Sequence, residues 1–167
     1  MKKMTEENLS NAFAGESQAH IKYLAFAEKA ERENFSNIAR LFRANSFAEQ
    51  VHATNHLRTL SGIGETKQNV QAAIDGETFE VTEMYPAYIR VAEEQEEKVA
   101  ETMNKWALEA EKVHADLYKK AKEALNKGED MEFKPIHVCN VCGFTVEGEA
   151  PDKCPVCGSP KEKFTRF

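Results

Sequence analysis

Gly15-Glu16-Ser17 and Glu49-Gln50-Val51-His52-Ala53 return later in the chain as Gly76-Glu77-Thr78 and Glu111-Lys112-Val113-His114-Ala115. The isolated glutamates are 61 residues apart, and the glutamates of the two Glu-x-x-His motifs are 62 apart. This repeat indicates a duplicated helical hairpin. Because Glu and His three residues apart lie on one helix face, both side chains can point at the same metal ion. Four carboxylates and two imidazoles in a four-helix bundle are the ligand set of a carboxylate-bridged di-iron site.

The composition is typical of a mostly helical globular protein. The 167 residues include 41% hydrophobic and 30% charged residues, enough for one domain or one and a half. The net charge of −6 argues against general nucleic-acid binding, which needs clustered cations. We find no signal peptide and no apolar run near the roughly 20 residues of a membrane span, so we expect a cytoplasmic protein without membrane contact.

Periodicity and breakers predict four helices. The first runs from about Thr5 to Arg32 with Thr5 as its cap, and the second is capped by Ser36 and stops near Ser61-Gly62-Ile63-Gly64. The third begins between Thr66 and Asn69, and Pro86 predicts a kink in it. A turn within Glu93–Lys98, which lacks glycine and proline, leads to a fourth helix that ends by Lys127-Gly128.

The character of the chain changes after Gly128. Residues 1–128 form the predicted helical bundle, 129–134 a linker, and 135–167 a small module with all four cysteines. The module has almost no apolar core of its own, so a metal must hold it together. Cysteines confined to one short segment indicate metal binding in a reducing compartment rather than disulfides.

A glutamate on a Glu-rich helix is usually a solvated surface group, and one Glu-x-x-His pair is weak evidence. The recurrence of both elements at matched spacing favours a metal site. Glu16 also lies on the stripe of Leu9 and Phe13, which should face the core. Several carboxylates cannot be buried together without cations, and oxygen ligands with a few imidazoles suit iron or manganese.

Some other residues near these motifs have no exact counterpart in the other copy of the repeat. Glu80 follows Glu77 by three residues on the same face, where the first half has Ala19, and it could bind one metal in one oxidation state only. Tyr23 and Tyr85 are interpreted either as core packing or as hydrogen-bond donors and redox buffers beside the metals. Two further histidines have no partner in the repeat, and we interpret them as structural or near-site residues: His20 and His56.

The cysteines form two Cys-x-x-Cys-Gly loops, at Cys139–Gly143 and Cys154–Gly158. Four thiolates at this spacing predict a tetrahedral metal site, and the glycines let the backbone turn tightly after each pair. Either zinc or iron fits. A structural zinc ribbon is the commoner case, whereas a redox-active iron would relay electrons to the di-metal site.

Taken together these motifs resemble the rubrerythrin family over essentially the whole chain. The matching stretches are Ala12–Ala19, Glu49-x-x-His52, Gly76-Glu77-x-x-Glu80, Glu83-Met84-Tyr85-Pro86, Ala110-Glu111-x-x-His114 and the rubredoxin-like knuckles. The resemblance implies a mainly α fold, with a ferritin-like four-helix bundle followed by a small rubredoxin-like four-cysteine metal domain.

The resemblance also implies the cofactors and their ligands. Two irons would be bound by Glu16, Glu49, His52, Glu77, Glu80, Glu111 and His114, and a third iron, with zinc as a substitute, by Cys139, Cys142, Cys154 and Cys157. In the family one iron exchanges the equivalents of Glu80 and His52 when its redox state changes. We therefore assign catalytic roles to Glu80, His52, Tyr23 and Tyr85.

The implied activity is reduction of hydrogen peroxide to water, which protects against oxidative stress. Electrons would come from an NAD(P)H-dependent reductase or from rubredoxin. Three other functions stay open: ferritin-like iron oxidation and storage, a binding module with a structural zinc ribbon, and an O2-activating oxygenase. The four-cysteine module argues against storage, and no substrate pocket for an oxygenase can be read from the sequence.

The connection between the second and third helices predicts a domain-swapped homodimer. It must run back along the bundle over about 28 Å, the sum of the helix lengths beyond His52 and before Glu77. The segment from Leu60 to Gln68 reaches at most roughly 26–29 Å when fully extended. Either the helix ends melt, or the two halves pair with those of a neighbour.

Overall fold

The computed structural model describes residues 1–132 and 134–167 and divides the chain into two compact units, residues 1–64 and 65–167. Phe133, within the predicted linker, lies outside the described residues, and the predicted domain boundaries stay a prediction. No helix of the described part is both long and apolar enough to span a membrane.

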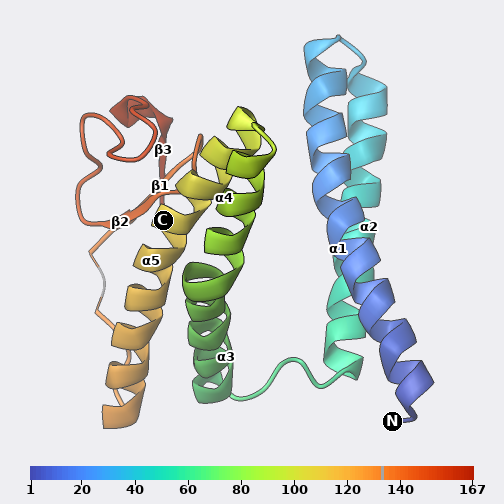
Figure 1. Cartoon of the computed structure of the whole chain (residues 1–167). Coiled ribbons are helices and arrows are strands. Elements are labelled where there is room, and N and C mark those ends of the chain that lie inside the picture. Colours follow the sequence, from blue (N-terminus) through green and yellow to red (C-terminus); the bar gives the residue numbers. More distant parts are fainter. Residues whose placement is uncertain (133) are drawn as a thin grey trace. The chain divides into compact units, whose positions relative to one another are not determined.

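The first unit is a pair of packed helices, α1 (Lys3–Arg32) and α2 (Ser36–Thr59) (Figure 1). Its buried residues are small, mainly alanines at positions 27, 30, 39 and 53, so the helix backbones approach closely. Hydrogen bonds between His20 and Ser46 also join the two helices. The Ser46 hydroxyl donates to the His20 carbonyl oxygen at 2.9 Å, and the His20 ring Nδ1 lies 2.9 Å from Ser46 Oγ. The structural interpretation of His20 is therefore supported.

Two predicted helix caps are wrong. The helix α1 begins at Lys3, so Thr5 lies inside its first turn. Phe35 holds the cap position of α2, and Ser36 is already helical, with its hydroxyl donating to the Glu31 carboxylate at 3.3 Å. For Ser36 the physical reason is the turn that ends α1, which directs the chain into α2 without the extended residue that a serine cap needs.

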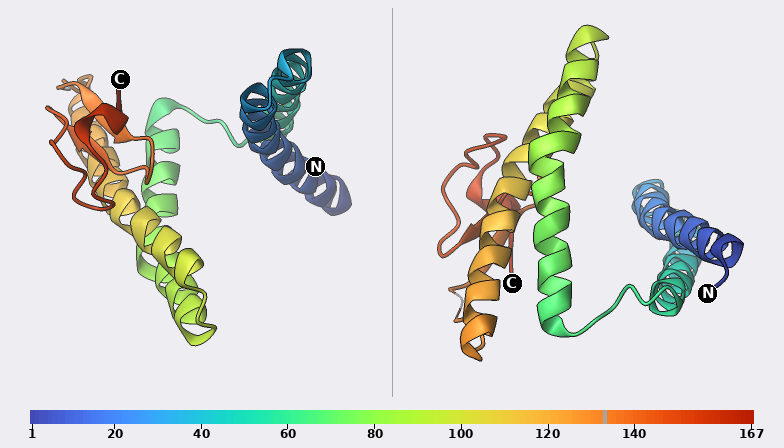
Figure 2. Two further views of the ribbon diagram at one scale, coloured as in Figure 1. Left: turned by 90° about the horizontal axis from the view of Figure 1, so that it is seen from above. Right: turned by 60° about the horizontal axis from the view of Figure 1, so that its bottom comes forward.

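In the second unit α3 (Thr66–Phe79) continues through the π-helical segment η1 (Glu80–Met84) into α4 (Tyr85–Glu94), as Figure 2 shows. Glu65 and Gln68 form a capping box at the predicted start of α3. The π segment ends shortly before Pro86, where the sequence predicts a kink. Pro86 has no N–H group, and the N–H of Tyr85 before it reaches back five residues to the Glu80 carbonyl.

The π segment explains why the repeat has two spacings. Before it, Gly15 and Glu16 match Gly76 and Glu77 at 61 residues. After it, the buried positions Ala27, Ala30 and Ala53 match the buried Ile89, Ala92 and Ala115 at 62 residues. A π turn holds one more residue than an α turn. The extra residue of the second copy is thus absorbed between Glu77 and Ile89, where Glu80 opens the π segment.

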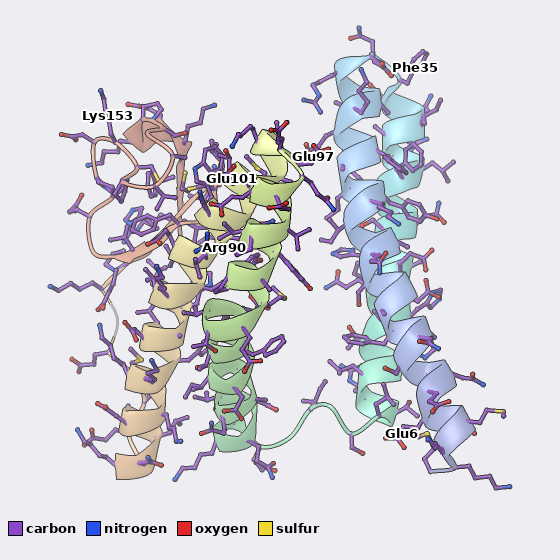
Figure 3. All side chains as sticks on the ribbon, viewed as in Figure 1. Glu6, Phe35, Arg90, Glu97, Glu101 and Lys153 are labelled. Atoms are coloured by element: carbon purple, nitrogen blue, oxygen red, sulfur yellow. The ribbon has the colours of Figure 1, made fainter. Side chains whose placement is uncertain are left out.

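The turns inside the two hairpins have the same backbone geometry. The N–H of Phe35 donates to the Ala30 carbonyl at 2.8 Å, and that of Glu97 donates to the Ala92 carbonyl at 2.9 Å. Figure 3 shows Phe35 and Glu97 at their respective turns. In each turn the preceding residue is left-handed, with φ 63° at Asn34 and φ 57° at Glu96. These are Schellman motifs built without glycine, and they explain why the second turn carried no sequence signal.

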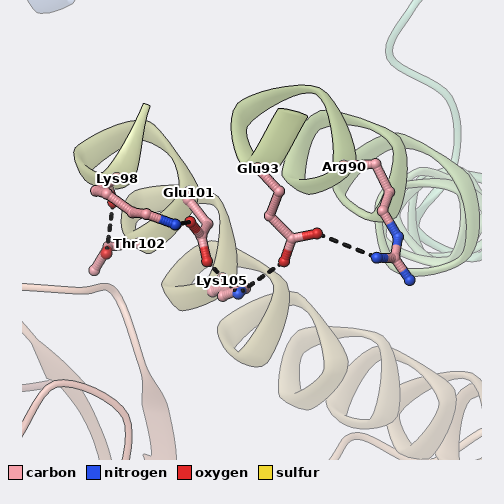
Figure 4. A network of polar contacts seen from close by, with 6 residues as sticks. All are labelled: Arg90, Glu93, Lys98, Glu101, Thr102 and Lys105. Carbon is pink, nitrogen blue, oxygen red and sulfur yellow. Dashed lines mark hydrogen bonds and ion pairs between the residues drawn. The ribbon is translucent and has the colours of Figure 1, made fainter. Parts of the chain in front are cut away.

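The helix α5 (Lys98–Lys127) packs along α3 and α4. Its first turns are joined to α4 by a network of exposed ion pairs (Figure 4). The Lys105 ammonium lies 2.6 Å from the Glu101 carboxylate and 3.1 Å from that of Glu93 on α4. Hydrogen bonds from Lys105 and Lys98 lower the pKa of Glu101.

The four-cysteine module completes the second unit. Its three-stranded antiparallel sheet has the order β2 (Thr145–Glu147), β1 (Ile136–Cys139), β3 (Phe164–Arg166), with a short 3-10 turn, η2 (Lys161–Lys163), before β3. The strand β2 contacts α5. The mainly α fold class with a C-terminal four-cysteine metal domain is thereby confirmed.

Glu96→Gly should stabilise the protein by about 0.5–1 kcal/mol, because glycine adopts a left-handed backbone without the steric cost of a Cβ atom. The thermal unfolding midpoint should rise by a few degrees. The matched control is Glu123→Gly on the exposed face of α5, which should lose about 1 kcal/mol. Equal destabilisation by both glycines would contradict the turn geometry.

Candidate metal centres

Each unit brings one isolated glutamate and one Glu-x-x-His pair together. In the first unit, Glu16 on α1 lies beside Glu49 and His52 on α2, and one possible ligand atom of each falls within 4.8 Å of the others. Glu49 Oε2 is 2.9 Å from His52 Nδ1. One turn of α2 separates these two residues, so the helix itself sets their contact.

The second unit repeats this arrangement with Glu77 on α3 and with Glu111 and His114 on α5. His114 Nδ1 lies 2.6 Å from Glu111 Oε2 and 3.9 Å from Glu77 Oε2. These side chains retain between 17% and 29% of their exposure, so the cluster is half-buried within its own unit.

The electrostatics of the second cluster fit a bound cation. Burial, followed by the hydrogen bond and charge of Glu111, raises the pKa of Glu77 to about 7. Burial and the charge of Glu111 also raise the pKa of Glu80. Carboxylates held this close resist ionisation together, and a divalent cation between them removes that cost. The donor set of carboxylate oxygens and imidazole nitrogens suits iron.

The two predicted tyrosines lie in different surroundings. Tyr23 belongs to an aromatic cluster in the first unit, with ring centroids 6.3 Å from Phe26 and 6.0 Å from Phe42. Tyr85 opens α4 directly after the π segment. Burial, then the charges of Glu111, Glu80 and Glu77, raise the pKa of Tyr85. Tyr85 therefore lies near the second cluster, and its phenol keeps its proton at neutral pH.

The four cysteines converge at the tips of the two knuckles. Cys139 Sγ and Cys157 Sγ are 3.7 Å apart, and Cys142 Sγ and Cys154 Sγ are 3.5 Å apart. A disulfide needs about 2.05 Å between its sulfurs. Four sulfurs bonded at about 2.3 Å to one tetrahedral ion lie about 3.8 Å from one another. The arrangement therefore fits a single tetrahedral metal.

The glycine that follows each pair has the predicted role. Gly143 and Gly158 have φ of 79° and 75°, in the region that L side chains rarely adopt. Their N–H groups donate to the carbonyls of Cys139 and Cys154 at 2.9 Å. Burial raises the pKa of the Cys142 thiol, so a cation is needed to hold this sulfur as the thiolate.

One contact at the second cluster has no signal in the sequence. His114 Nε2 lies 2.8 Å from the hydroxyl oxygen of Thr145, at the start of β2 in the four-cysteine module. Thr145 has no counterpart in the repeated helices, and its position three residues after Cys142 does not indicate a role beyond the module. Only the packing of β2 on α5 brings it to the histidine.

The fold and both groups of ligands define a helical di-metal carboxylate protein with a four-thiolate module. The rubrerythrin family model matches residues 7–122, and the model of the rubrerythrin rubredoxin-like domain matches residues 137–165. Rubrerythrin-2 of Clostridium acetobutylicum is 41% identical, over 98% of this chain and 97% of that protein. Nigerythrin of Nitratidesulfovibrio vulgaris is 37% identical, over 98% and 86%.

Solved structures agree with these matches. A fully reduced, all-ferrous nigerythrin aligns with a TM-score of 0.57 and 34% identity, over 98% of this chain and 86% of that one. The chain belongs to the rubrerythrin family. It is therefore an oxidoreductase whose cofactors are a carboxylate-and-histidine di-iron site and a four-cysteine iron site, and both groups of ligands are present.

Glu49→Ala should remove both carboxylate-bound irons, because it leaves the remaining buried ligands without a carboxylate that we expect to bridge the metals. Metal analysis of protein purified without oxygen should fall from about three irons per chain to about one, the ion held by four thiolates. Red thiolate absorption after oxidation serves as the internal control. Three irons and full activity in this variant would show that Glu49 is not a ligand.

Proposed function

We propose that the protein is a peroxidase that reduces hydrogen peroxide to water, with electrons relayed through the four-cysteine site. The observation that carries the proposal is the presence of two carboxylate-and-histidine clusters and a four-thiolate site in one chain. Storage of iron needs no thiolate site, and a structural zinc ribbon alone does not account for the carboxylate clusters.

The proposed ligands are those that the family resemblance implies. Glu16, Glu49 and His52 supply one half of the di-iron centre, and Glu77, Glu80, Glu111 and His114 supply the other half. When bound, the two irons supply two electrons to the O–O bond and act as Lewis acids toward the oxide charge that develops. Two electrons and two protons convert one peroxide into two water molecules.

The side chains around the centre would bind the irons and donate hydrogen bonds. We assign Tyr85 as a hydrogen-bond donor toward the centre, because it keeps its proton while lying near three carboxylates. Glu80 opens the irregular π segment, so its backbone is less constrained by regular helical hydrogen bonds than that of Glu77. This fits the exchangeable ligand that the family pattern assigns to Glu80, with His52 as its alternative. For Tyr23 we propose the same donor role in the first half.

The electron donor is proposed from the family resemblance: a rubredoxin or an NAD(P)H-dependent reductase. The contact of the four-cysteine module with α5 supports a relay, since it places the thiolate site and half of the proposed di-iron ligands in one compact unit. A four-cysteine module joined to the bundle only by a flexible linker would lack this contact.

We further propose that the two halves of the di-iron centre come from two chains of a domain-swapped dimer. In support of this, α2 is helical to Thr59 and α3 is helical from Thr66. From His52 to the end of α2 is about 10–11 Å, and from the start of α3 to Glu77 is about 16–17 Å, at 1.5 Å per residue.

A connection within one chain would therefore have to return over about 27 Å, if the helices run parallel as in ferritin-like bundles. The seven Cα steps from Thr59 to Thr66 reach at most about 23–25 Å. The chain is too short for that path, and a short hinge favours exchange with a second copy.

The surface of each unit supports the same proposal. The first unit leaves large apolar side chains uncovered, including Ile21, Leu41 and Phe47, each at least 61% exposed. The second unit leaves Phe79 and Val91 more than half exposed. Two helices cannot bury two apolar faces by themselves, so each hairpin needs a partner hairpin.

Cys142→Ser should abolish turnover driven by NADH and a reductase, because the thiolate site loses a ligand. Chemically pre-reduced protein should still consume about one peroxide per di-iron centre, since that chemistry lies in the bundle. Stopped-flow assays of both reactions separate the two cases. Unchanged NADH-driven turnover would make the module purely structural.

Co-expression of a Glu49→Ala chain with a Glu111→Ala chain tests the exchange. In a swapped heterodimer one site carries both lesions and the other is intact, so activity should return to about a quarter of the wild-type value for random pairing. In an unswapped protein every site carries one lesion. Each variant expressed alone is the control. An inactive co-expressed mixture would contradict the proposed domain swap.

A further inference from the structure

The hydroxyl of Thr145 is buried between the four-cysteine module and the proposed di-iron ligand His114. Thr145 is 5% exposed, so its hydroxyl needs protein partners to offset the loss of water. It has two. It donates to the Gly143 carbonyl at 3.1 Å, and it lies 2.8 Å from His114 Nε2.

The hydrogen-bond roles follow from proton counting. A carbonyl oxygen can only accept, so a hydrogen bond to Gly143 uses the single hydroxyl proton of Thr145. With that proton on the Gly143 side, the hydroxyl oxygen accepts from His114, and the Nε2 of the ring carries a proton. Without a metal, the 2.6 Å contact between Nδ1 and Glu111 also needs a proton; a metal ion bound here would replace that proton and take the Nδ1 lone pair.

The Nδ1 atom is the one that faces the carboxylates. It lies 2.6 Å from Glu111 and 3.9 Å from Glu77. The two ring nitrogens of His114 therefore have different partners. Nε2 contacts Thr145 on β2, and Nδ1 lies beside the carboxylates of α3 and α5, where a metal would bind. Outer partners of this kind set the tautomer and orientation of metal-binding histidines.

The matching histidine in the first unit is not held in this way. Within residues 1–132 and 134–167, the ring of His52 has one hydrogen-bond partner, Glu49 on its own helix. His114 has two, one of them outside its helix. The two halves of the repeat therefore contain the same proposed ligands, but only the histidine of the second half has a hydrogen-bond partner outside its own helix in the described residues.

We infer that Thr145 is a positioning residue that fixes His114 as a permanent ligand through Nδ1 and couples it to the backbone of the Cys142–Gly143 knuckle. The inference rests on the proposed assignment of His114 as an iron ligand. By this coupling the four-cysteine loop and the di-iron centre share a buried hydroxyl, and the module supports the geometry of the centre as well as supplying its electrons.

The test replaces the hydroxyl in the full-length, iron-loaded protein. Thr145→Val keeps the shape and β-strand preference of the side chain but cannot accept the Nε2 proton. We expect the carboxylate-bound ferrous ions to be lost to a chelator about 10–100-fold more readily. Thr145→Ser should restore wild-type retention. Thr165→Val, which removes another threonine hydroxyl of the same module, one that bonds Asn140, is the matched control and should change nothing.

A second readout separates positioning from folding. The exchangeable imidazole proton of iron-bound His114 should exchange faster with water in Thr145→Val, as seen in proton NMR of the reduced protein. The red absorption of the oxidised thiolate site should stay unchanged. Wild-type iron retention in Thr145→Val would overturn the inference. Loss of the red absorption together with the carboxylate-bound iron would also overturn it, because the iron loss would then follow from disruption of the module and not from the lost contact with His114.

His114→Ala, measured beside these variants, tells the two failures apart. If His114→Ala loses iron and Thr145→Val does not, only the role of Thr145 fails. If His114→Ala keeps both carboxylate-bound irons, His114 is not a ligand, and the proposed assignment of the di-iron centre fails with it.

Discussion

Carboxylates that face inward in a helical protein repel one another unless cations lie between them, and this constraint shapes the chain. In each unit a glutamate and a Glu-x-x-His pair converge within 4.8 Å. Burial, followed by the hydrogen bond and charge of Glu111, raises the pKa of Glu77 to about 7. The same logic holds for the buried Cys142 thiol in the small module. Bound metal ions therefore stabilise the fold as well as carrying its chemistry.

Duplication explains most of the helical architecture. The places where the second copy differs from the first lie close to the proposed ligands. The two Schellman turns and the buried positions on either side repeat at one spacing. A single extra residue in the second copy is absorbed as a π segment that begins at Glu80. Irregular turns of this kind occur often at functional sites. The inserted residue thus gives the second half a feature that a perfect repeat could not contain.

The four-cysteine module packs against the second hairpin. Its two knuckles form a tetrahedral thiolate site, and its strand β2 contacts the helix that bears His114. The shared hydroxyl of Thr145 makes this contact specific. The module and the second hairpin therefore behave as one structural unit, whereas the first hairpin has an apolar surface that calls for a partner.

Sequence alone determined the helices, the repeated Glu and Glu-x-x-His positions and the cysteine knuckles, because helical period and ligand spacing are local properties. The convergence of Glu16 with Glu49, and of Glu77 with Glu111, followed from the hairpin pattern. The cap at Thr5 was wrong because α1 begins earlier, at Lys3. The cap at Ser36 was wrong because the Schellman turn at Asn34, which has no glycine and so no local signature, leads directly into α2. Only tertiary structure decided that Thr145 meets His114. The two residues are 31 positions apart, and a contact set by strand-on-helix packing is invisible to any local pattern.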